Sequence, residues 1–346
     1  MAEIVVAGHL CLDIIPTFPP GSSGDVVRPG RAIDMEPAVL ATGGVANTGL
    51  ALHRLGIETQ LAMKIGDDRF GSLVLDLLRA QGPHLADGII VGPGEATSYS
   101  VILSPPGVDR TFLHCPGANH SFRAADMPQL AGRMFHFGYP TAMRSMYEAG
   151  GAELGRVFVR AKAAGMVTSL DLCWPDQPAT QQDWRAIFAA VLPKVDVFLP
   201  SIEEVVFLLE KRPITLADVN RKLLQDLSGR LLDFGSKVVV LKLGDRGLYL
   251  RTAKQTPFGP AWSGVEMHQP CFEVNVVGTT GAGDCTIAGF LTGLLKGLSP
   301  EQTMTAATAA GACNVEAADA TSGVPSWDKL QARIANGWKR KNTTIQ

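Results

Sequence analysis

Short apolar runs that end at glycine or another turn residue alternate along this chain with segments of helical spacing. The runs that predict buried strands are residues 4–7, 59–65, 134–137, 167–172, 195–199 and 238–243. The segments with helical spacing include residues 45–55, 70–80, 153–164 and 202–209. Strands that are apolar throughout and alternate with helices are typical of a mostly parallel sheet covered on both faces. The chain is therefore predicted to adopt an α/β fold.

Two segments depart from this rhythm. Residues 16–41 are rich in proline and glycine and have no helical period, whereas residues 97–113 alternate around a turn at 105–107, which indicates a β-hairpin. We expect them to form a small β-sheet lid over the open edge of the large sheet. The predicted division is a large α/β nucleotide- and substrate-binding domain of residues 1–15, 42–96 and 117–346, with a β-lid of residues 16–41 and 97–116.

The composition excludes several classes of protein. A net charge of -2 over 346 residues, with no cluster of lysine and arginine, does not predict a nucleic-acid partner. No run approaches the ~20 apolar residues that span a bilayer, so we expect no membrane partner. The six cysteines are scattered without a C-x-x-C pair, which does not indicate a zinc site. Without a signal peptide at its N-terminus, the chain is expected to be cytoplasmic with reduced thiols.

The most informative stretch for function is residues 276–286, Val-Val-Gly-Thr-Thr-Gly-Ala-Gly-Asp-Cys-Thr. We expect a strand to enter it and an apolar helix, residues 287–295, to leave it. Three glycines in six positions let the backbone come close to a ligand and turn successive N–H groups into one concavity. A helix N-terminus adds partial positive charge, so the stretch predicts a phosphate site.

Asp284 lies beside this predicted phosphate site. A carboxylate there can accept the proton of an attacking hydroxyl while backbone dipoles hold the charge on a phosphoryl group. The alternative is a first-turn residue that the helix dipole favours. A Walker-type loop is excluded because Asp284 rather than lysine follows Gly283, and a dinucleotide-binding turn is excluded because Thr286 stands where a third glycine is needed.

Residues 278–284 closely resemble the C-terminal signature of the ribokinase/PfkB carbohydrate kinase family. Residues 43–51, Gly-Gly-Val-Ala-Asn-Thr-Gly-Leu-Ala, resemble its N-terminal signature, and the order and spacing of the two match over nearly the whole chain. The resemblance implies a ribokinase-like fold, in which a Rossmann-like α/β domain carries a β-lid. It also implies Mg-ATP as donor and phosphorylation of an alcohol, often a hydroxymethyl group.

Residue roles follow from the same resemblance. Asp284 resembles the catalytic base, and the turn from Gly281 through Ala282 and Gly283 to Asp284 resembles the anion hole. The residues that resemble contacts to substrate hydroxyls are Asp13, Gly43, Gly44 and Asn47. The alternatives are a turn residue for Asp13 and a helix N-terminal residue for Asn47.

The nucleotide side is assigned in the same way. Lys242, Gly244 and Gly247 resemble a turn beside the ATP phosphates or ribose, although residues 242–247 also suit an ordinary hairpin turn. The predicted cofactor-binding set also contains Thr279 and Asn314, which matches a position near the adenine but also suits a helix-packing surface. Arg110, on the second lid segment, is predicted either to meet the transferred phosphate or to pair with a neighbouring acid.

Two positions depart from the family pattern. Gly278 stands where the family commonly has an aspartate that helps to hold a monovalent cation, so we do not expect potassium activation. The N-x-x-E motif tied to magnesium reads Ser201-Ile-Glu-Glu204 here. Glu204 can still hydrogen-bond metal-bound water, whereas Ser201 is shorter than asparagine.

The leading prediction is therefore a kinase for a small sugar. A nucleoside kinase of the same fold is the runner-up, and it would need an aromatic stacking platform, for which Tyr99 and Phe112 on the second lid segment are candidates. A non-catalytic sugar- or nucleotide-binding homologue is the third reading. The resemblance also implies a homodimer through the lid, and the residues do not identify the substrate.

Overall fold

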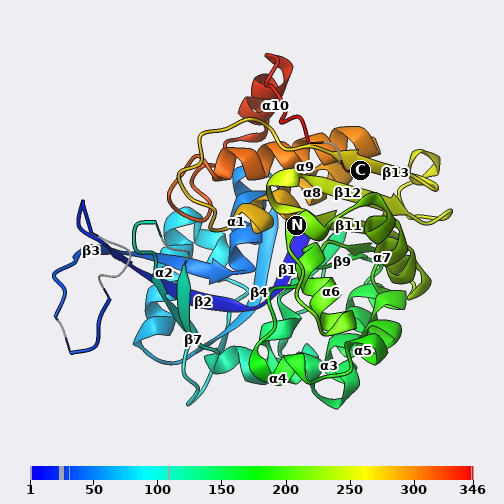
Figure 1. Ribbon diagram of the computed structural model, residues 1–346. Coiled ribbons are helices and arrows are strands. Elements are labelled where there is room, and N and C mark those ends of the chain that lie inside the picture. The colour runs from blue at the N-terminus through cyan, green and yellow to red at the C-terminus, as the bar shows by residue number, and fades with distance from the viewer. Residues whose placement is uncertain (1, 23–26, 31, 108–109, 344, 346) are drawn as a thin grey trace.

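The computed structural model describes residues 2–22, 27–30, 32–107, 110–343 and 345. Positions 23–26, 31 and 108–109 of the two predicted lid segments lie outside the described residues. Within the described ranges the chain forms two sheets, one large and one small (Figure 1).

The large sheet is mostly parallel, as predicted. Its spatial order is β13 (Glu266–Gln269), β12 (Leu248–Thr252), β11 (Val238–Lys242), β10 (Val197–Phe198), β9 (Val167–Leu170), β8 (Met134–Gly138), β1 (Ile4–Gly8), β4 (Thr59–Gly66) and β5 (Ile90–Gly92). The strands from β11 to β5 pair in parallel, whereas β12 and β13 are antiparallel to their neighbours.

Consecutive residues of the central strands belong to two different cores. In β1, Ile4 and Val6 pack into one core, while Val5 and Ala7 pack into the other. Side chains alternate across a strand, so a strand buried on both faces needs an apolar residue at every position. This explains why the strands appear in the sequence as unbroken apolar runs.

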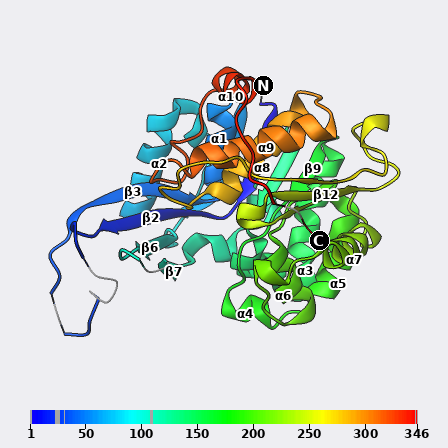
Figure 2. The ribbon, with the colours of Figure 1, turned by 45° about the horizontal axis from the view of Figure 1, so that its top comes forward.

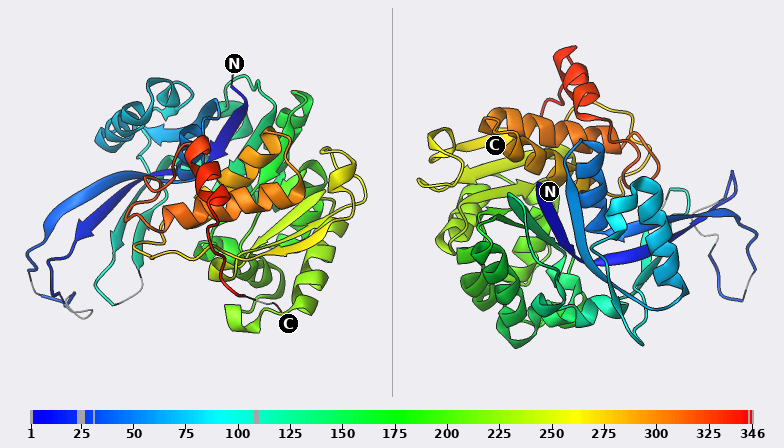
Figure 3. Two further views of the ribbon diagram at one scale, coloured as in Figure 1. Left: turned by 90° about the horizontal axis from the view of Figure 1, so that it is seen from above. Right: turned by 180° about the vertical axis from the view of Figure 1, so that it is seen from behind.

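Helices cover both faces of this sheet (Figures 1 and 3). One core is built with α1 (Ala46–Arg54), α2 (Arg69–Gln81), α8 (Ala282–Leu295), α9 (Pro300–Asn314) and α10 (Trp327–Ala335). The other is built with α3 (Arg144–Ala163), α4 (Gln177–Thr180), α5 (Trp184–Val191), α6 (Ile202–Glu210) and α7 (Arg221–Asp233). Helix α3 is interrupted at 148–151, where the backbone leaves helical geometry.

Short 3-10 turns join several of these elements. They are η1 (Pro83–Ala86), η2 (Gly117–Ser121), η3 (Ala124–Asp126), η4 (Pro140–Ala142), η5 (Leu192–Lys194), η6 (Leu216–Asp218), η7 (Gly244–Arg246) and η8 (Pro260–Trp262). The turn η7 connects β11 to β12, so residues 242–247 do form a hairpin connection.

The small sheet has the order β3 (Glu36–Gly44), β2 (Leu10–Thr17), β6 (Tyr99–Leu103) and β7 (Thr111–Cys115). Strands β6 and β7 pair antiparallel, which confirms the predicted hairpin. The long strands β2 and β3 reach away from the main body (Figure 2). Because β2 begins at Leu10 and β3 runs on to Gly44, the sheet takes residues from both sides of the predicted boundaries at 15/16 and 41/42; the domain division itself stays a prediction.

The two sheets meet where β1 ends. Only His9 separates Gly8, the last residue of β1, from Leu10, the first residue of β2. The chain therefore passes from the carboxyl end of a central parallel strand directly into the small sheet. In open α/β sheets ligands bind at this carboxyl edge, so the connection brings the small sheet to the predicted site.

The strand that we expected to enter the glycine-rich stretch is absent, and that prediction was wrong. Residues 274–280 form neither strand nor helix, and Val276 and Val277 are 59% and 64% exposed. The segment passes the end of α9 instead, where the N–H groups of Val277 and Gly278 donate to the Val315 carbonyl at 2.7 and 3.2 Å. The two valines therefore resemble a buried strand in the sequence, but they belong to neither sheet.

Two predictions about the whole chain can be compared with the structure. Among the described residues, none of the helices has the length and apolar character that a membrane crossing demands. All six cysteines are unpaired, and Cys11, Cys285 and Cys313 are buried.

Candidate active site

The glycine-rich stretch turns sharply into helix α8. Gly281 has φ 72°, and a Cβ placed there would lie 2.1 Å from the Ala320 carbonyl oxygen, so only glycine fits. The first i→i−4 bond of the helix is donated by Cys285 to the Gly281 carbonyl at 2.8 Å. The N–H groups of Gly283 and Asp284 therefore precede the helical ladder, while that of Ala282 donates to the Thr279 carbonyl at 3.3 Å.

Asp284 lies in this first turn and is 4% exposed. The Tyr139 hydroxyl donates to its two carboxylate oxygens at 2.9 and 3.1 Å, and the Thr48 hydroxyl donates to Oδ1 at 3.3 Å. Burial raises the pKa of Asp284, while the Lys242 ammonium and the hydrogen bonds from Tyr139 and Thr48 lower it. A buried carboxylate with a raised pKa is suited to accept a proton near neutral pH.

A second buried charge cluster lies beside the turn. Lys242 Nζ is 3.6 Å from Asp171 Oδ2, and it would be 3.7 Å from a Cβ placed on Gly283. Burial alone would lower the pKa of Lys242, but the carboxylates of Asp171, Glu204 and Asp284 raise it. The lysine therefore stays charged, and its ammonium lies next to Gly283 in the first turn of α8.

Glu204 is held at the start of α6. Its Oε2 accepts a hydrogen bond from the Ser201 N–H at 2.9 Å, which forms a capping box across the first turn. Burial raises the pKa of Glu204 to about 7, while the Lys242 ammonium lowers it. Ser201 therefore uses its backbone to orient Glu204, although its side chain is shorter than asparagine.

Asp13 lies in β2, close enough to Asp284 for the two carboxyls to interact. It is 6% exposed, and the Cys11 thiol donates to its Oδ1 at 3.3 Å. Gly43 lies directly against it, because a Cβ on Gly43 would be 2.3 Å from Asp13 Oδ2. Burial raises the pKa of Asp13 to about 6, and the nearby charge of Asp284 adds to the shift.

The other predicted substrate residues lie in the same region. Gly44 ends β3, and Asn47 lies in the first turn of α1 with its Oδ1 buried and without a hydrogen-bond partner among the described residues. Asn47 also lies close enough to Asp284 to lower the pKa of that carboxyl. Residues from β2, β3 and α1 thus lie close to Asp284.

The predicted lid contacts residues 279–284, here called the phosphate turn, through Arg110. Its Nη1 donates to the Thr280 Oγ1 at 2.7 Å, which joins the β6–β7 connection to the glycine-rich stretch across 170 residues of sequence. Both predicted roles for Arg110, at the transferred phosphate or paired with a neighbouring acid, stay predictions.

A pocket of about 460 Å³ opens beside the start of α8. The predicted residues that line it are Arg110, Lys242, Gly244, Gly247, Thr279, Ala282 and Gly283. Asn314 is not among its lining residues: it is fully buried, and its Nδ2 donates to the Thr280 carbonyl at 2.8 Å. Asn314 therefore holds the backbone of the glycine-rich stretch through this hydrogen bond.

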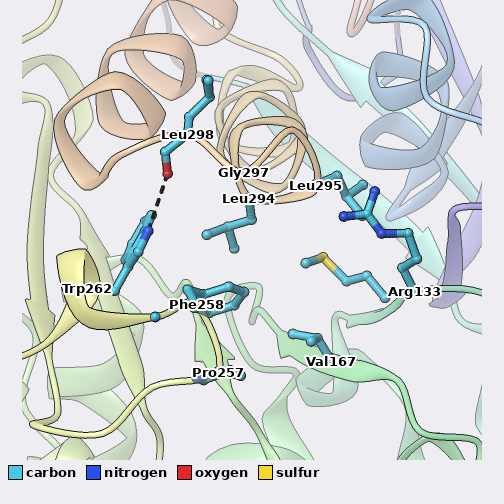
Figure 4. Close-up of a pocket in the computed structure, with 11 residues that line it drawn as sticks. Arg133, Val167, Pro257, Phe258, Trp262, Leu294, Leu295, Gly297 and Leu298 are labelled. Carbon is cyan, nitrogen blue, oxygen red and sulfur yellow. Dashed lines mark hydrogen bonds between the residues drawn. The ribbon is translucent and has the colours of Figure 1, made fainter.

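A second pocket, of about 370 Å³, lies at the opposite edge of the sheet (Figure 4). Its walls include Met134 and Val167, the first residues of β8 and β9, together with Leu294 at the end of α8. Asp284 lies in the first turn of that helix, ten residues before Leu294 and therefore about 15 Å away along its axis. This apolar pocket is therefore separate from the predicted site.

Sequence reasoning missed Tyr139 and Asp171 as site residues. Tyr139 follows β8 and Asp171 follows β9, so both lie at the carboxyl edge of the parallel sheet, where that position alone could have signalled them. A contact between a buried and an exposed histidine was missed as well: His9 Nε2 lies 3.3 Å from His114 Nε2, and His114 Nδ1 lies 2.9 Å from Ser100 Oγ.

Comparison with known proteins relates the chain to carbohydrate kinases. The sequence profile of the pfkB family carbohydrate kinases matches residues 1–327. A 2-dehydro-3-deoxygluconokinase of Bacillus subtilis is 28% identical over 312 residues, covering 85% of this chain and 86% of the relative. A ribokinase of Staphylococcus aureus is 26% identical over 272 residues, covering 78% and 80%.

Solved structures share the fold. A fructokinase with bound ATP from Xylella fastidiosa superposes with a TM-score of 0.75 at 19% identity, covering 97% of this chain and 99% of that one. A ribokinase of Arabidopsis thaliana complexed with ribose and ATP gives 0.72 at 19% identity, covering 96% and 98%. The predicted ribokinase-like fold is thereby confirmed.

Proposed function

The chain belongs to the pfkB family of carbohydrate kinases, and we propose that it transfers the terminal phosphoryl group of ATP to a hydroxyl, of the hydroxymethyl type, on a small sugar-like substrate. The observation that carries the proposal is the position of Asp284, which is buried in the phosphate turn and hydrogen-bonded to Thr48, the sequence neighbour of Asn47 in α1. In the proposed reaction Asp284 accepts the hydroxyl proton. The freed oxygen bonds to the γ-phosphorus as the bond to ADP breaks.

The phosphate side of the proposal rests on fixed positive charge. The N–H groups of Gly283 and Asp284 precede the helical ladder, and the helix dipole adds to them. The Lys242 ammonium lies beside the same turn. Donors of this kind hold the charge that grows on a migrating phosphoryl group without having to reorganise.

The acceptor side rests on polar side chains with spare hydrogen-bonding capacity. Asp13 offers a carboxylate, and the unpartnered Asn47 Oδ1 offers an amide acceptor. The close approach of Gly43 to Asp13 leaves no side chain there to cover the carboxylate. Vicinal sugar hydroxyls would donate to these oxygens, with Gly43 and Gly44 forming the backbone surface below the sugar.

Magnesium is the metal that the proposed reaction implies. The residues fit it: both Asp171 carboxylate oxygens lack a hydrogen-bond partner among the described residues, and Glu204 lies in the same buried cluster. Hard oxygen ligands suit magnesium, which usually keeps several waters, so Glu204 would bind it through water. When bound, the ion would offset charge on the ATP phosphates.

A sugar is favoured over a nucleoside as the acceptor. Tyr99, one of the two lid aromatics considered as a stacking platform, packs edge-on against Phe70 of α2 with centroids 5.3 Å apart. The other, Phe112, is 51% exposed. Neither position supports a stacking platform for the nucleobase of a nucleoside substrate.

Two further parts of the proposal concern the protein's setting. The unpaired cysteines are consistent with a cytoplasmic location. A homodimer through the lid is supported by apolar side chains on β3 and β7 that are 41–54% exposed, namely Val39, Leu40, Phe112 and Leu113.

The proposal is tested by Asp284→Asn in an ADP-release assay over a panel of sugars, sugar acids and nucleosides. We expect turnover to fall about 10²–10⁴-fold while ATP affinity is kept. Asp328→Asn is the matched control, because Asp328 is also an acidic first-turn residue, on the exposed start of α10. If both variants kept full activity, Asp284 would be only a dipole-favoured residue and the assignment would be wrong.

A further inference from the structure

The chain after α10 lies beyond residue 327, where the family match ends. It turns back toward the body of the molecule (Figures 1 and 3). The Lys341 N–H donates to the Cys271 carbonyl at 2.8 Å, and the Glu273 N–H donates to the Lys339 carbonyl at 2.9 Å. Residues 337–343, here called the C-terminal tail, thus pair with the segment 271–273.

Side chains fasten the tail to this segment. The Phe272 ring stacks on the Trp338 indole with centroids 4.3 Å apart. The Arg340 guanidinium lies 4.0 Å from the centroid of the Phe272 ring. Arg340 also donates to the Pro270 carbonyl at 2.6 Å, and the Trp338 indole N–H donates to the Glu273 carbonyl at 2.9 Å. Phe272 is 2% exposed as a result.

The fastened segment is a wall of the 460 Å³ pocket beside α8. Cys271, Phe272 and Val274 line that pocket, and so does Lys341 from the tail itself. Lys341 Nζ lies 3.5 Å from Asp245 Oδ2 in the turn between β11 and β12, and its side chain is 33% exposed. The tail therefore brings a cation to a pocket that also contains the phosphate turn.

We propose that Lys341 is a nucleotide-binding residue, which the C-terminal tail brings to the nucleoside end of the pocket. The inference rests on the proposed function, which puts the ATP phosphates at Gly283 and Lys242. The nucleoside then extends along the rest of the pocket, whose walls include Leu248 and Phe272, toward Lys341. The ammonium donates to ribose hydroxyls or to acceptor atoms of the base.

The test compares Lys341→Ala with Lys339→Ala. Lys339 is the matched control, because it is exposed and its hydrogen bond to the segment 271–273 is made by its backbone carbonyl. For Lys341→Ala we expect the KM for ATP to rise roughly three- to tenfold and the Kd for ADP to rise by the same factor, with kcat unchanged. Lys341→Arg should restore most of the loss, and Lys339→Ala should behave as the native protein.

Two results would overturn the inference. One is an unchanged KM for ATP in Lys341→Ala. The other is a higher KM for ATP with an unchanged Kd for ADP, which would place the ammonium at the terminal phosphate instead of the nucleoside. Either failure is separate from that of the proposed function, because Asp284→Asn tests the base in a protein with an intact tail.

Discussion

The Tyr139 hydroxyl donates a hydrogen bond to both carboxylate oxygens of Asp284, at 2.9 and 3.1 Å. Tyr139 immediately follows β8 and has a left-handed backbone, with φ 64° and ψ 37°. Residues other than glycine rarely adopt this conformation, and where they do it often belongs to a functional site. The strained backbone here aims the phenol at the proposed base, and its hydrogen bond opposes the rise in the Asp284 pKa that burial causes.

Replacing Tyr139 by phenylalanine should therefore slow turnover, because Asp284 loses the hydrogen bond that positions its carboxylate. A hydrogen bond to a charged group contributes about 1.5–3 kcal/mol, so we expect kcat to fall about ten- to hundredfold. The acidic limb of the pH–rate profile should move to higher pH, because the pKa of Asp284 loses a group that lowers it. Tyr249→Phe in β12 is the control, and a native profile in Tyr139→Phe would contradict the role of this bond.

The sequence was sufficient for most of the fold because its strands are buried on both faces. Such strands keep an unbroken apolar run, and six strands between residues 4 and 243 could be located from it with small errors at their ends. Residues 276 and 277 show the limit of this argument. Two exposed valines next to a glycine look like the end of a strand, and only the hydrogen bonds to Val315 show where the segment lies.

The candidate site was predictable where its residues are close in sequence. The turn from Gly281 to Asp284 and the cluster from Gly43 to Asn47 each form a local motif. Tyr139 lies 145 positions from Asp284, so their contact depends on the order of strands in the sheet. The order of the strands cannot be derived from the periodicity of the sequence.

Asp13 should make the stability of the protein depend on pH. Burial raises its pKa from 3.8 to about 6, so folding favours the neutral acid. The stabilising contribution is complete below pH 3.8 and is lost as the pH rises through 6. We therefore expect Asp13→Asn to be more stable than the native protein at pH 7.5, by about 1–3 kcal/mol, and to lose this advantage as the pH falls.

Urea unfolding of both proteins between pH 5 and 8 measures this difference. The same variant should raise the KM for the acceptor, since a carboxylate that binds sugar hydroxyls has been replaced by an amide. A stability difference that does not change with pH would show that folding does not raise the pKa of Asp13.

Activity should not require potassium. Gly278 has no side chain, and a Cβ placed there would lie 2.9 Å from the Ala317 carbonyl oxygen and 3.1 Å from that of Ala318. A carboxylate at this position would need the backbone to move. We expect turnover in sodium or tetramethylammonium salts to be within about twofold of that in potassium at equal ionic strength. A large gain on adding potassium would mean that other groups bind the cation.

The lid should hold two copies of the chain together. Phe112 and Leu113 in β7 are 51% and 54% exposed, and an exposed apolar strand at the edge of a sheet is normally covered by a partner. We expect light scattering during size-exclusion chromatography to give twice the chain mass of 36.7 kDa. Leu113→Asp should shift the protein to monomer, because a carboxylate in a dry interface lacks a partner.

Val159→Asp is the matched control for that variant. Val159 is similarly exposed, at 52%, but lies on α3 rather than on the small sheet. It should therefore leave the mass at twice that of the chain. A native protein that elutes as a monomer at assay concentration, or a dimer that Val159→Asp dissociates and Leu113→Asp does not, would exclude the lid as the interface.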